Sequence, residues 1–378
     1  MCPDARKIVC PASGVFPIAG GRLPTDTFCM KYGIFCVILS GLILSCSGQD
    51  RGLCFLEREP EKPRCAERGR IGLVLGVSGL GDNSFNDMQY AGLVQARLSM
   101  PVTGFVRAPA DARPETLDRV FSDLVMTDRC SLVIVSESYI MVDAVLRSAR
   151  EHPEVTFVLM DHAAVALPNI ASSQFAQNEV GFAAGYLAGR LSPGKPVGYI
   201  GGVDLWSVRD FLAGFEAGLA RAANGSHLIV EYLSRIPDFS GFTSPGRAHS
   251  LAETMYARGA RIVAAVAGAS GTGIIAAARR LGHLAIGVDS DQDHLAPGAV
   301  LTSMVKRVDV AITNFVGWHL AGRLKGGRAY RFGYRERGVG LTEFEFTRTL
   351  VPPDLRRELS EIESDLAAGR IRPAGADL

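Results

Sequence analysis

The sequence predicts an α/β protein of two doubly wound lobes, each with a parallel sheet covered by helices on both faces. From residue 70 onward, apolar runs of strand length alternate with stretches of helical periodicity. These runs are almost continuously apolar, which is typical of parallel strands buried on both faces. The 378 residues hold more βα units than one sheet of ordinary width needs. The length suits two units of about 100–150 residues each.

The individual elements can be placed from these patterns. The strand candidates are short apolar runs: Arg70–Val77, Ser131–Val135, Val155–Met160, Pro196–Ile200, Ile229–Leu233, Arg261–Ala265 and Leu284–Val288. After the first run, apolar residues recur at helical spacing: Phe85, Met88, Ala91, Val94 and Leu98. Another helix is predicted from about Tyr139 to Glu151. In doubly wound sheets, ligands bind in the loops beyond the carboxyl ends of strands, so those loops are where we look for a site.

The composition excludes several classes of function. With 40 basic and 39 acidic residues, the net charge is +1, and nothing in this balance indicates a nucleic-acid partner. Seven of the eight cysteines lie in the first 65 residues, and Cys130 is the exception. A disulfide framework would distribute its cysteines through the fold. The absence of a CxxC pair also argues against zinc and redox motifs. We expect no cofactor and no metal.

The N-terminal region predicts export and a lipid anchor. Residues 33–45 are apolar or small, with Lys31 as a positive flank, and have the length of a signal-peptide core. This stretch is short for a membrane-spanning helix. It ends in Ile43-Leu44-Ser45-Cys46, which resembles a bacterial lipobox and makes Cys46 the predicted lipidation site. The alternative interpretation is an apolar segment of a core helix.

Met30 is the natural start for such a signal. We therefore expect residues 1–29 to be an untranslated extension and residues 30–45 to be the signal peptide. Residues 46–69 are charged and contain proline, which predicts a flexible tether. Whether Cys54 and Cys65 pair within it stays open. The predicted location is the cell membrane, with the folded part facing the periplasm or the cell exterior.

Four loops after predicted strands carry candidate ligand groups. In Ser78–Asn86, Asp82 could cap the following helix or meet a ligand, and the loop lacks the Gly-Lys-Ser/Thr of a phosphate-binding P-loop. Asp161 directly follows a predicted strand, and the small residues of 268–273 would let a ligand approach the backbone. The acidic loop 287–292 could also suggest a metal, but calcium would need more oxygen ligands.

Enzyme motifs are missing from the sequence. There is no G-x-S-x-G and no H-E-x-x-H, and the seven histidines show no metal-ligand spacing. A nucleoside hydrolase would need a calcium-binding aspartate cluster, for which Asp289, Asp291 and Asp293 are the candidates. We therefore expect a binding protein rather than an enzyme.

The string Gly81-Asp-Asn-Ser-Phe-Asn86 is the first of several that match a known family. It resembles the D-D-x-S-F-N signature of the basic membrane protein family of bacterial lipoproteins, which includes purine nucleoside receptors. Further matches follow in order at 168–170, 181–185, 198–202, 211–218, 287–292, 301–309 and 338–342. The resemblance covers about residues 70–345, which is essentially the whole predicted fold.

The resemblance implies a type I periplasmic-binding fold, in which two lobes joined by crossover segments close on a ligand and serve an ABC permease. The implied segments are 70–175 plus 301–325 for the first lobe, 176–300 plus 326–350 for the second, and 351–378 for a C-terminal helix and tail. Nucleoside-binding members hold the base between aromatic rings and the ribose through an acid and a lysine. Such stacking contributes roughly 1–3 kcal/mol per base.

Carried over to this chain, the resemblance implies a set of ligand-binding residues: Asp82, Asn86, Tyr90, Asp161, Phe242, Gly268, Asp289 and Lys306. Tyr90 and Phe242 would be the two stacking rings, and Asp289 and Lys306 the ribose pair. Phe85 is interpreted as a core anchor of its helix.

The chain departs from the family's pattern at 135–138, 207–209 and 267–271, which line or border the expected cleft. The prediction is a lipid-anchored receptor that passes a purine nucleoside to an ABC permease. The alternatives are a surface lipoprotein or sensor of the same fold with a different small ligand, and an intracellular regulator. The regulator would need a DNA-binding helix pair, which we do not find.

Overall fold

In a computed structural model of the chain, the structure describes residues 38–39, 42–43 and 69–375. The strands β1 (Ile38–Leu39) and β2 (Leu42–Ile43) pair antiparallel. The predicted start at Met30, the predicted lipidation site Cys46, and Cys54 and Cys65 lie outside the described residues. Among the helices that the structure describes, none has the length and apolar character needed to cross a membrane.

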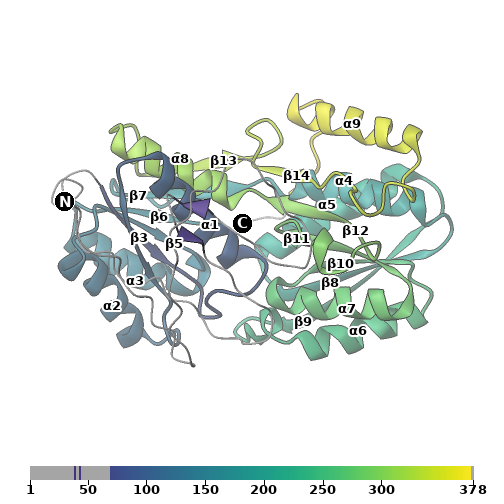
Figure 1. The fold of residues 1–378 in the computed structure, drawn as a ribbon, viewed down its shortest axis with the longest axis horizontal. Coiled ribbons are helices and arrows are strands. Elements are labelled where there is room, and N and C mark those ends of the chain that lie inside the picture. Colours follow the sequence, from purple (N-terminus) through teal and green to yellow (C-terminus); the bar gives the residue numbers. More distant parts are fainter. Residues whose placement is uncertain (1–37, 40–41, 44–68, 376–378) are drawn as a thin grey trace, which may run out of the picture. The chain divides into compact units, whose positions relative to one another are not determined.

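Residues 69–375 form two lobes, each built on a six-stranded sheet (Figure 1). All neighbours in the first sheet are parallel. Its strands, in spatial order, are β13 (Arg328–Phe332), β7 (Ile170–Phe175), β6 (Thr156–Leu159), β5 (Leu132–Val135), β3 (Arg70–Val74) and β4 (Thr103–Arg107). The helices that cover it are α1 (Phe85–Ser99), α2 (Pro114–Ser122), α3 (Ser138–Glu151) and α8 (Val308–Leu320). A short π-helical turn, Asp123–Thr127, extends α2.

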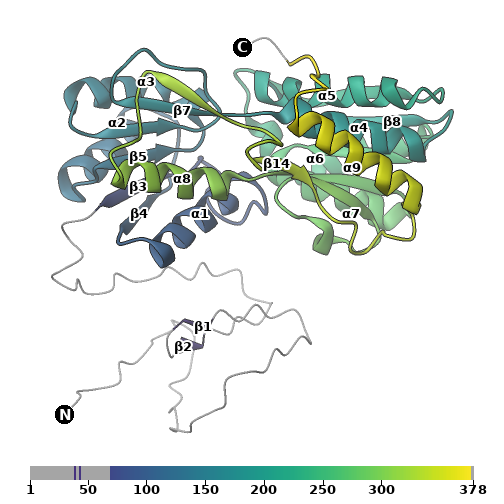
Figure 2. The same ribbon diagram turned by 90° about the horizontal axis from the view of Figure 1, so that it is seen from above.

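The second sheet has the same winding with one antiparallel edge. Its strands, in spatial order, are β14 (Val339–Leu341), β12 (Val300–Lys306), β11 (Leu284–Asp289), β10 (Ile262–Val266), β8 (Pro196–Asp204) and β9 (His227–Arg235). Strand β14 runs antiparallel to β12, and the other pairs are parallel. Its helices are α4 (Gln177–Leu191), α5 (Trp206–Ala222), α6 (Pro245–Ala257), α7 (Gly271–Leu281) and α9 (Pro353–Ala367). Figure 2 shows α9 lying against the second lobe, where Ile362 and Leu366 pack on Phe182 of α4.

Most of the predicted strands are buried along their whole length, and β9, at the edge of the second sheet, is the partly exposed exception. All four residues of β5 and all five of β10 are buried, as the continuous apolar runs indicate. The chain passes between the lobes three times: from β7 to α4, from β12 to α8, and from β13 to β14.

The sheet order corrects the predicted lobe boundaries. Residues 301–306 were expected in the first lobe, but they form most of β12 in the second sheet. Residues 328–332 were expected in the second lobe, but they form β13 beside β7 in the first sheet. The chain therefore returns to the first lobe at residue 307 and leaves it after 332, because β13 completes the edge of the first sheet and β14 the edge of the second.

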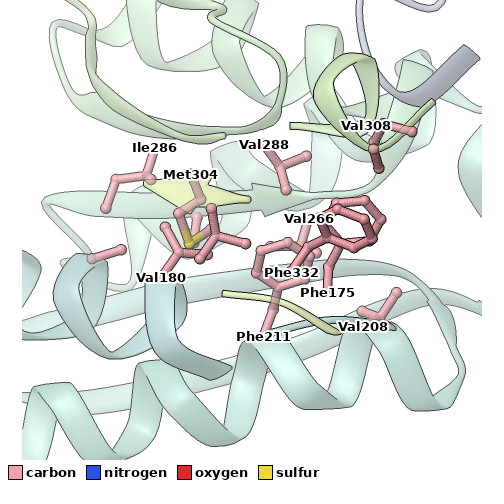
Figure 3. Close-up of a cluster of buried hydrophobic side chains, with 14 of the residues drawn as sticks. Phe175, Val180, Val208, Phe211, Val266, Ile286, Val288, Met304, Val308 and Phe332 are labelled. Carbon is pink, nitrogen blue, oxygen red and sulfur yellow. The ribbon is translucent and has the colours of Figure 1, made fainter. Parts of the chain in front are cut away.

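The crossover segments pack around a shared apolar cluster. Phe175, at the end of β7, stacks on Phe332, at the end of β13, with ring centroids 5.3 Å apart. The Ala176 N–H donates to the carbonyl of Phe332 at 2.9 Å, which ties the two crossovers together. Figure 3 shows this ring pair beside Val308, with Val266 and Phe211 of the second lobe close by. The first and third crossings, both of which lead into the second lobe, are thus anchored in one apolar core.

Helices α4 and α5 approach so closely that their contact requires glycine. A Cβ added at Gly185 would lie 2.0 Å from the carbonyl oxygen of Phe215, and one at Gly218 would lie 1.9 Å from that of Phe182. The strings at 181–185 and 211–218, which we matched to the family by pattern, therefore have a structural reason. Each supplies glycines at the point where the two helix backbones meet.

Candidate functional site

A cavity lies between the two lobes, at the carboxyl ends of strands from both sheets, which is where doubly wound folds bind ligands. It encloses about 630 Å³ of empty space, counting the part that opens to solvent. The first lobe contributes Ser78, Asp82, Phe85, Asn86, Glu137, Tyr139 and Asp161, and the second contributes Ser207, Val208, Phe211, Phe242, Val266, Gly268, Ala269, Val288, Asp289 and Lys306.

Asp82 lines the cavity but directs its oxygens at its own loop. Its carboxylate accepts the backbone N–H groups of Ser84 at 2.9 Å, Asn86 at 2.9 Å and Asp87 at 3.2 Å. These are the free N–H groups at the start of α1, so Asp82 acts as a helix cap. Burial raises the pKa of Asp82, while the three backbone hydrogen bonds act in the opposite direction.

Asn86 connects the same loop to two strands. Its Oδ1 accepts the Gly76 N–H at 2.8 Å and the Ser136 hydroxyl at 3.2 Å. Its Nδ2 donates to Ser78 Oγ at 3.0 Å and to Asp82 at 3.1 Å. A side-chain amide has two donors and two acceptor positions, so all four are in use. Asn86 therefore holds the loop against the ends of β3 and β5.

Asp161 and Lys306 form a buried ion pair between the lobes. Lys306 ends β12 and Asp161 follows β6, and the lysine Nζ donates to the aspartate Oδ2. Both residues are buried, with Lys306 4% exposed. The lysine Nζ also lies 4.4 Å from the ring centroid of Phe85, within the range of a cation–π contact. Gln177 Nε2 donates to the other aspartate oxygen at 3.3 Å.

Asp289 is the second acid placed between the lobes. It ends β11 in the left-handed backbone region, with φ +65°, which aspartate and asparagine tolerate better than most residues. Its Oδ2 accepts the Ser84 hydroxyl of the first lobe at 2.6 Å. Burial raises the pKa of Asp289, and the nearby Lys306 charge opposes that shift. Asp289 and Lys306, the predicted pair, thus line the same cavity. Gly268 also lines it and has a left-handed backbone, with φ +54°.

The lobes touch along the rim of the cavity. The carbonyl oxygen of Asn83 accepts the Ser290 hydroxyl at 2.6 Å and Gln292 Nε2 at 3.0 Å. Tyr139 of the first lobe stacks on Phe239 of the second, with ring centroids 5.3 Å apart. The structure therefore has the closed arrangement of the lobes.

The aromatic residues differ from the prediction. Phe242 lines the cavity, but Tyr90 is not among its lining residues. Phe85, interpreted from sequence as a core anchor, does pack against the buried core, and its half-buried side chain also lines the cavity. Helix α1 begins at Phe85, so its first turn meets the cavity, whereas Tyr90 lies more than one turn further along.

Four further residues line the cavity although the sequence analysis did not predict them as ligand-binding residues. Glu137, Tyr139, Ser207 and Phe211 all reach the cavity. Departures from the family's pattern at 135–138 and 207–209 pointed to Glu137 and Ser207, but nothing in the local sequence indicated Tyr139 or Phe211. Within the described residues, no three His, Cys, Asp or Glu side chains are grouped so that they could hold a metal ion.

Comparisons with known proteins give a consistent result. Residues 71–364 match the family described as ABC transporter substrate-binding protein PnrA-like. Basic membrane protein B of Borreliella afzelii is 30% identical over 311 residues, covering 76% of this chain and 85% of the relative. Basic membrane protein D of Borreliella burgdorferi is 34% identical over 222 residues, covering 57% of this chain and 63% of the relative.

The fold has close structural counterparts. The crystal structure of an ABC transporter solute-binding protein from Aeropyrum pernix K1 superposes with a TM-score of 0.70 at 22% identity, covering 80% of this chain and 92% of that one. This likeness confirms the predicted type I periplasmic-binding fold.

Proposed function

Because the chain belongs to the PnrA-like family of ABC transporter substrate-binding proteins, we propose that it is a lipid-anchored receptor that captures a purine nucleoside between its lobes and delivers it to an ABC permease. Family membership carries the coarser role, a substrate-binding protein of an ABC transporter. The nucleoside and the anchor are the finer proposals. The role is binding without chemistry, with closure of the lobes as the event that a permease senses.

One observation carries the nucleoside proposal: a single cavity combines aromatic faces with an acid and a lysine. Phe85 comes from the first lobe, Phe211 and Phe242 come from the second, and flat rings suit a purine. Asp289 can accept two hydrogen bonds from vicinal ribose hydroxyls, and Lys306 has three N–H donors, of which Asp161 takes one.

The nucleoside is tested by isothermal titration calorimetry of the full chain in detergent against inosine, guanosine, adenosine and uridine. We expect heat from purine nucleosides with a Kd below 1 mM, in the ordinary range of specific ligands. No heat with any nucleoside would overturn the ligand and favour a sensor of the same fold.

The ribose role of Asp289 is tested by Asp289→Asn. Asparagine tolerates the left-handed backbone at this position, so the fold is kept while the charge is lost. Hydrogen bonds to charged groups contribute about 1.5–3 kcal/mol, so we expect Kd to rise by about 10- to 150-fold. The control is Asp291→Asn, at an exposed acid two residues further on. Unchanged affinity in Asp289→Asn would remove Asp289 from the site.

The anchor is tested by Cys46→Ala. If Cys46 carries the lipid, the variant leaves the membrane fraction and no longer incorporates labelled palmitate, while Cys130→Ala behaves as the parent chain. A Cys46→Ala chain that stays lipidated would contradict the anchor.

A further inference from the structure

Glu137 is a buried carboxylate on the cavity wall with no cation beside it. It lies between β5 and α3 and is 9% exposed. The Val77 N–H donates to its Oε2 at 3.0 Å. Within the described residues, Glu137 forms no ion pair, and burial raises its pKa without a compensating positive charge.

The other three carboxylates of the cavity are already engaged. Asp82 accepts the N–H groups at the start of α1, Asp161 holds Lys306, and Asp289 accepts Ser84 and is proposed to take the ribose. A carboxylate has about four acceptor positions, and one of those on Glu137 accepts the Val77 N–H. Among the described carboxylates of the cavity, Glu137 is the one that neither caps α1, nor pairs with a cation, nor is assigned to the ribose, so we assign its free acceptor positions to another part of the ligand.

The free acceptor positions of Glu137 determine which edge of a purine base it can bind. An ionised carboxylate offers acceptors and no donor, so it favours a ligand with two neighbouring N–H groups. Guanine has such an edge, formed by the ring N1–H and the 2-amino group. Hypoxanthine lacks the amino group. Adenine places a ring-nitrogen acceptor there, which would face the carboxylate's lone pairs.

We propose that Glu137 reads the base edge and that the cavity prefers guanosine over inosine and adenosine. This inference rests on the proposed function, because it specifies which nucleoside the site takes. Its position agrees with the sequence: Glu137 falls in the stretch 135–138, where the chain departs from the family's pattern. Tyr139, two residues further along and stacked on Phe239 of the second lobe, joins the two lobes beside this acid.

A structural role has to be separated from recognition, because Glu137 also fixes the loop after β3. A Cβ at Gly76 would lie 2.3 Å from the Glu137 carboxyl carbon, so the loop and this side chain are packed tightly. Loss of that packing would lower stability and weaken every ligand equally. Loss of recognition would change the ratio between ligands.

The experiment measures Kd for guanosine, inosine and adenosine on the full chain and on Glu137→Gln, together with the melting temperature of each. Glutamine keeps the shape but puts an N–H donor against the ligand's donors. In the parent chain we expect guanosine to bind tenfold or more tightly than inosine, in keeping with a hydrogen bond to a charged group. In Glu137→Gln that ratio should fall to about one, because the carboxylate's second acceptor is gone. The control, Glu115→Gln, makes the same change at an exposed position on α2 of the same lobe.

Each outcome decides something distinct. Nucleoside binding without a guanosine preference, or a preference that survives Glu137→Gln, overturns this inference and leaves the proposed function standing. An equal loss for all three nucleosides with a lower melting temperature means that Glu137 is structural, which also overturns it. No binding of any nucleoside to the parent chain overturns the proposed function itself.

Discussion

The two walls of the cavity are built on different principles. The first-lobe wall is mostly polar, with Ser78, Asp82, Asn86, Glu137 and Asp161, and much of it is held by hydrogen bonds within the wall. The second-lobe wall is mostly apolar and presents residues such as Phe211, Phe242, Val266, Gly268 and Val288. Hydrogen bonds are directional, whereas apolar contact depends on shape and area. The first wall is therefore suited to reading a ligand's edge and the second to covering its face.

Asn86→Ala should have the largest effect on stability, because it removes the hydrogen bonds that hold the first-lobe wall together. The change removes the acceptor of the Gly76 N–H and of the Ser136 hydroxyl, and both residues are buried. Each buried group left unpaired costs about 1–3 kcal/mol. We expect the free energy of unfolding to fall by roughly 2–4 kcal/mol, as measured by urea titration. Gln95→Ala, an exposed amide on the same helix, is the control, and an equally small loss in both variants would show that Asn86 does not hold the loop.

Phe242→Leu should act on the second wall and change affinity rather than stability. Leucine keeps the apolar contact but removes the ring face, so we expect nucleoside binding to weaken by roughly 1–3 kcal/mol. The matched control is Tyr90→Leu, the same kind of change outside the cavity lining, which should leave Kd within about twofold. Calorimetry checks both. The reverse result would restore Tyr90 as the stacking ring and remove Phe242.

The smallest expected effect is on the pH dependence of stability, and it comes from His319 of α8, which is not among the residues that line the cavity. Its Nε2 lies 3.0 Å from Ser131 Oγ, and burial lowers its pKa from the ordinary value of 6.5. The unfolded chain therefore takes up this proton at a higher pH than the folded chain. The contribution to stability is complete above about pH 6.5 and is lost as the pH falls toward the lower pKa of the folded state. The measurement is the free energy of unfolding at two pH values on either side of 6.5. Between the higher and the lower pH, this free energy should fall less in His319→Gln than in the parent chain. An identical drop would mean that His319 does not contribute.

The fold could be predicted from the sequence where burial is continuous. The apolar runs at 131–135, 155–160, 261–265 and 284–288 correspond to β5, β6, β10 and β11. Strand β7, Ile-Ala-Ser-Ser-Gln-Phe, gives no such signal, although it lies inside the first sheet, between β13 and β6. Its buried Ser172 and Ser173 hydroxyls bond to Ala163 and Met160, so polar residues occupy a strand interior. Strand β4 was missed for a different reason, since it lies at an edge and is only half-buried.

The cavity could be predicted in part, because strand ends and family motifs point to the same loops. Asp82, Asn86, Asp161, Phe242, Gly268, Asp289 and Lys306 all line it. Helix capping by Asp82 was one of the two roles that the sequence offered, but the sequence could not show that Asn86 uses its hydrogen bonds on the loop and the adjoining strand ends. It also could not show that Asp161 and Lys306 pair across the lobes, since they are 145 residues apart. Such facts depend on how the sheets are juxtaposed, which local patterns do not encode.

The three crossings between the lobes have a consequence for biosynthesis. Strand β13 and helix α8, which complete the first lobe, come from residues 308–332, after most of the second sheet has been made. A ribosome releasing the chain from its N-terminus therefore cannot deliver a finished first lobe before most of the second has emerged. Contacts between distant segments slow folding. The nascent chain thus stays incomplete until its last third is synthesised, and no cut of the chain into two pieces yields one whole lobe.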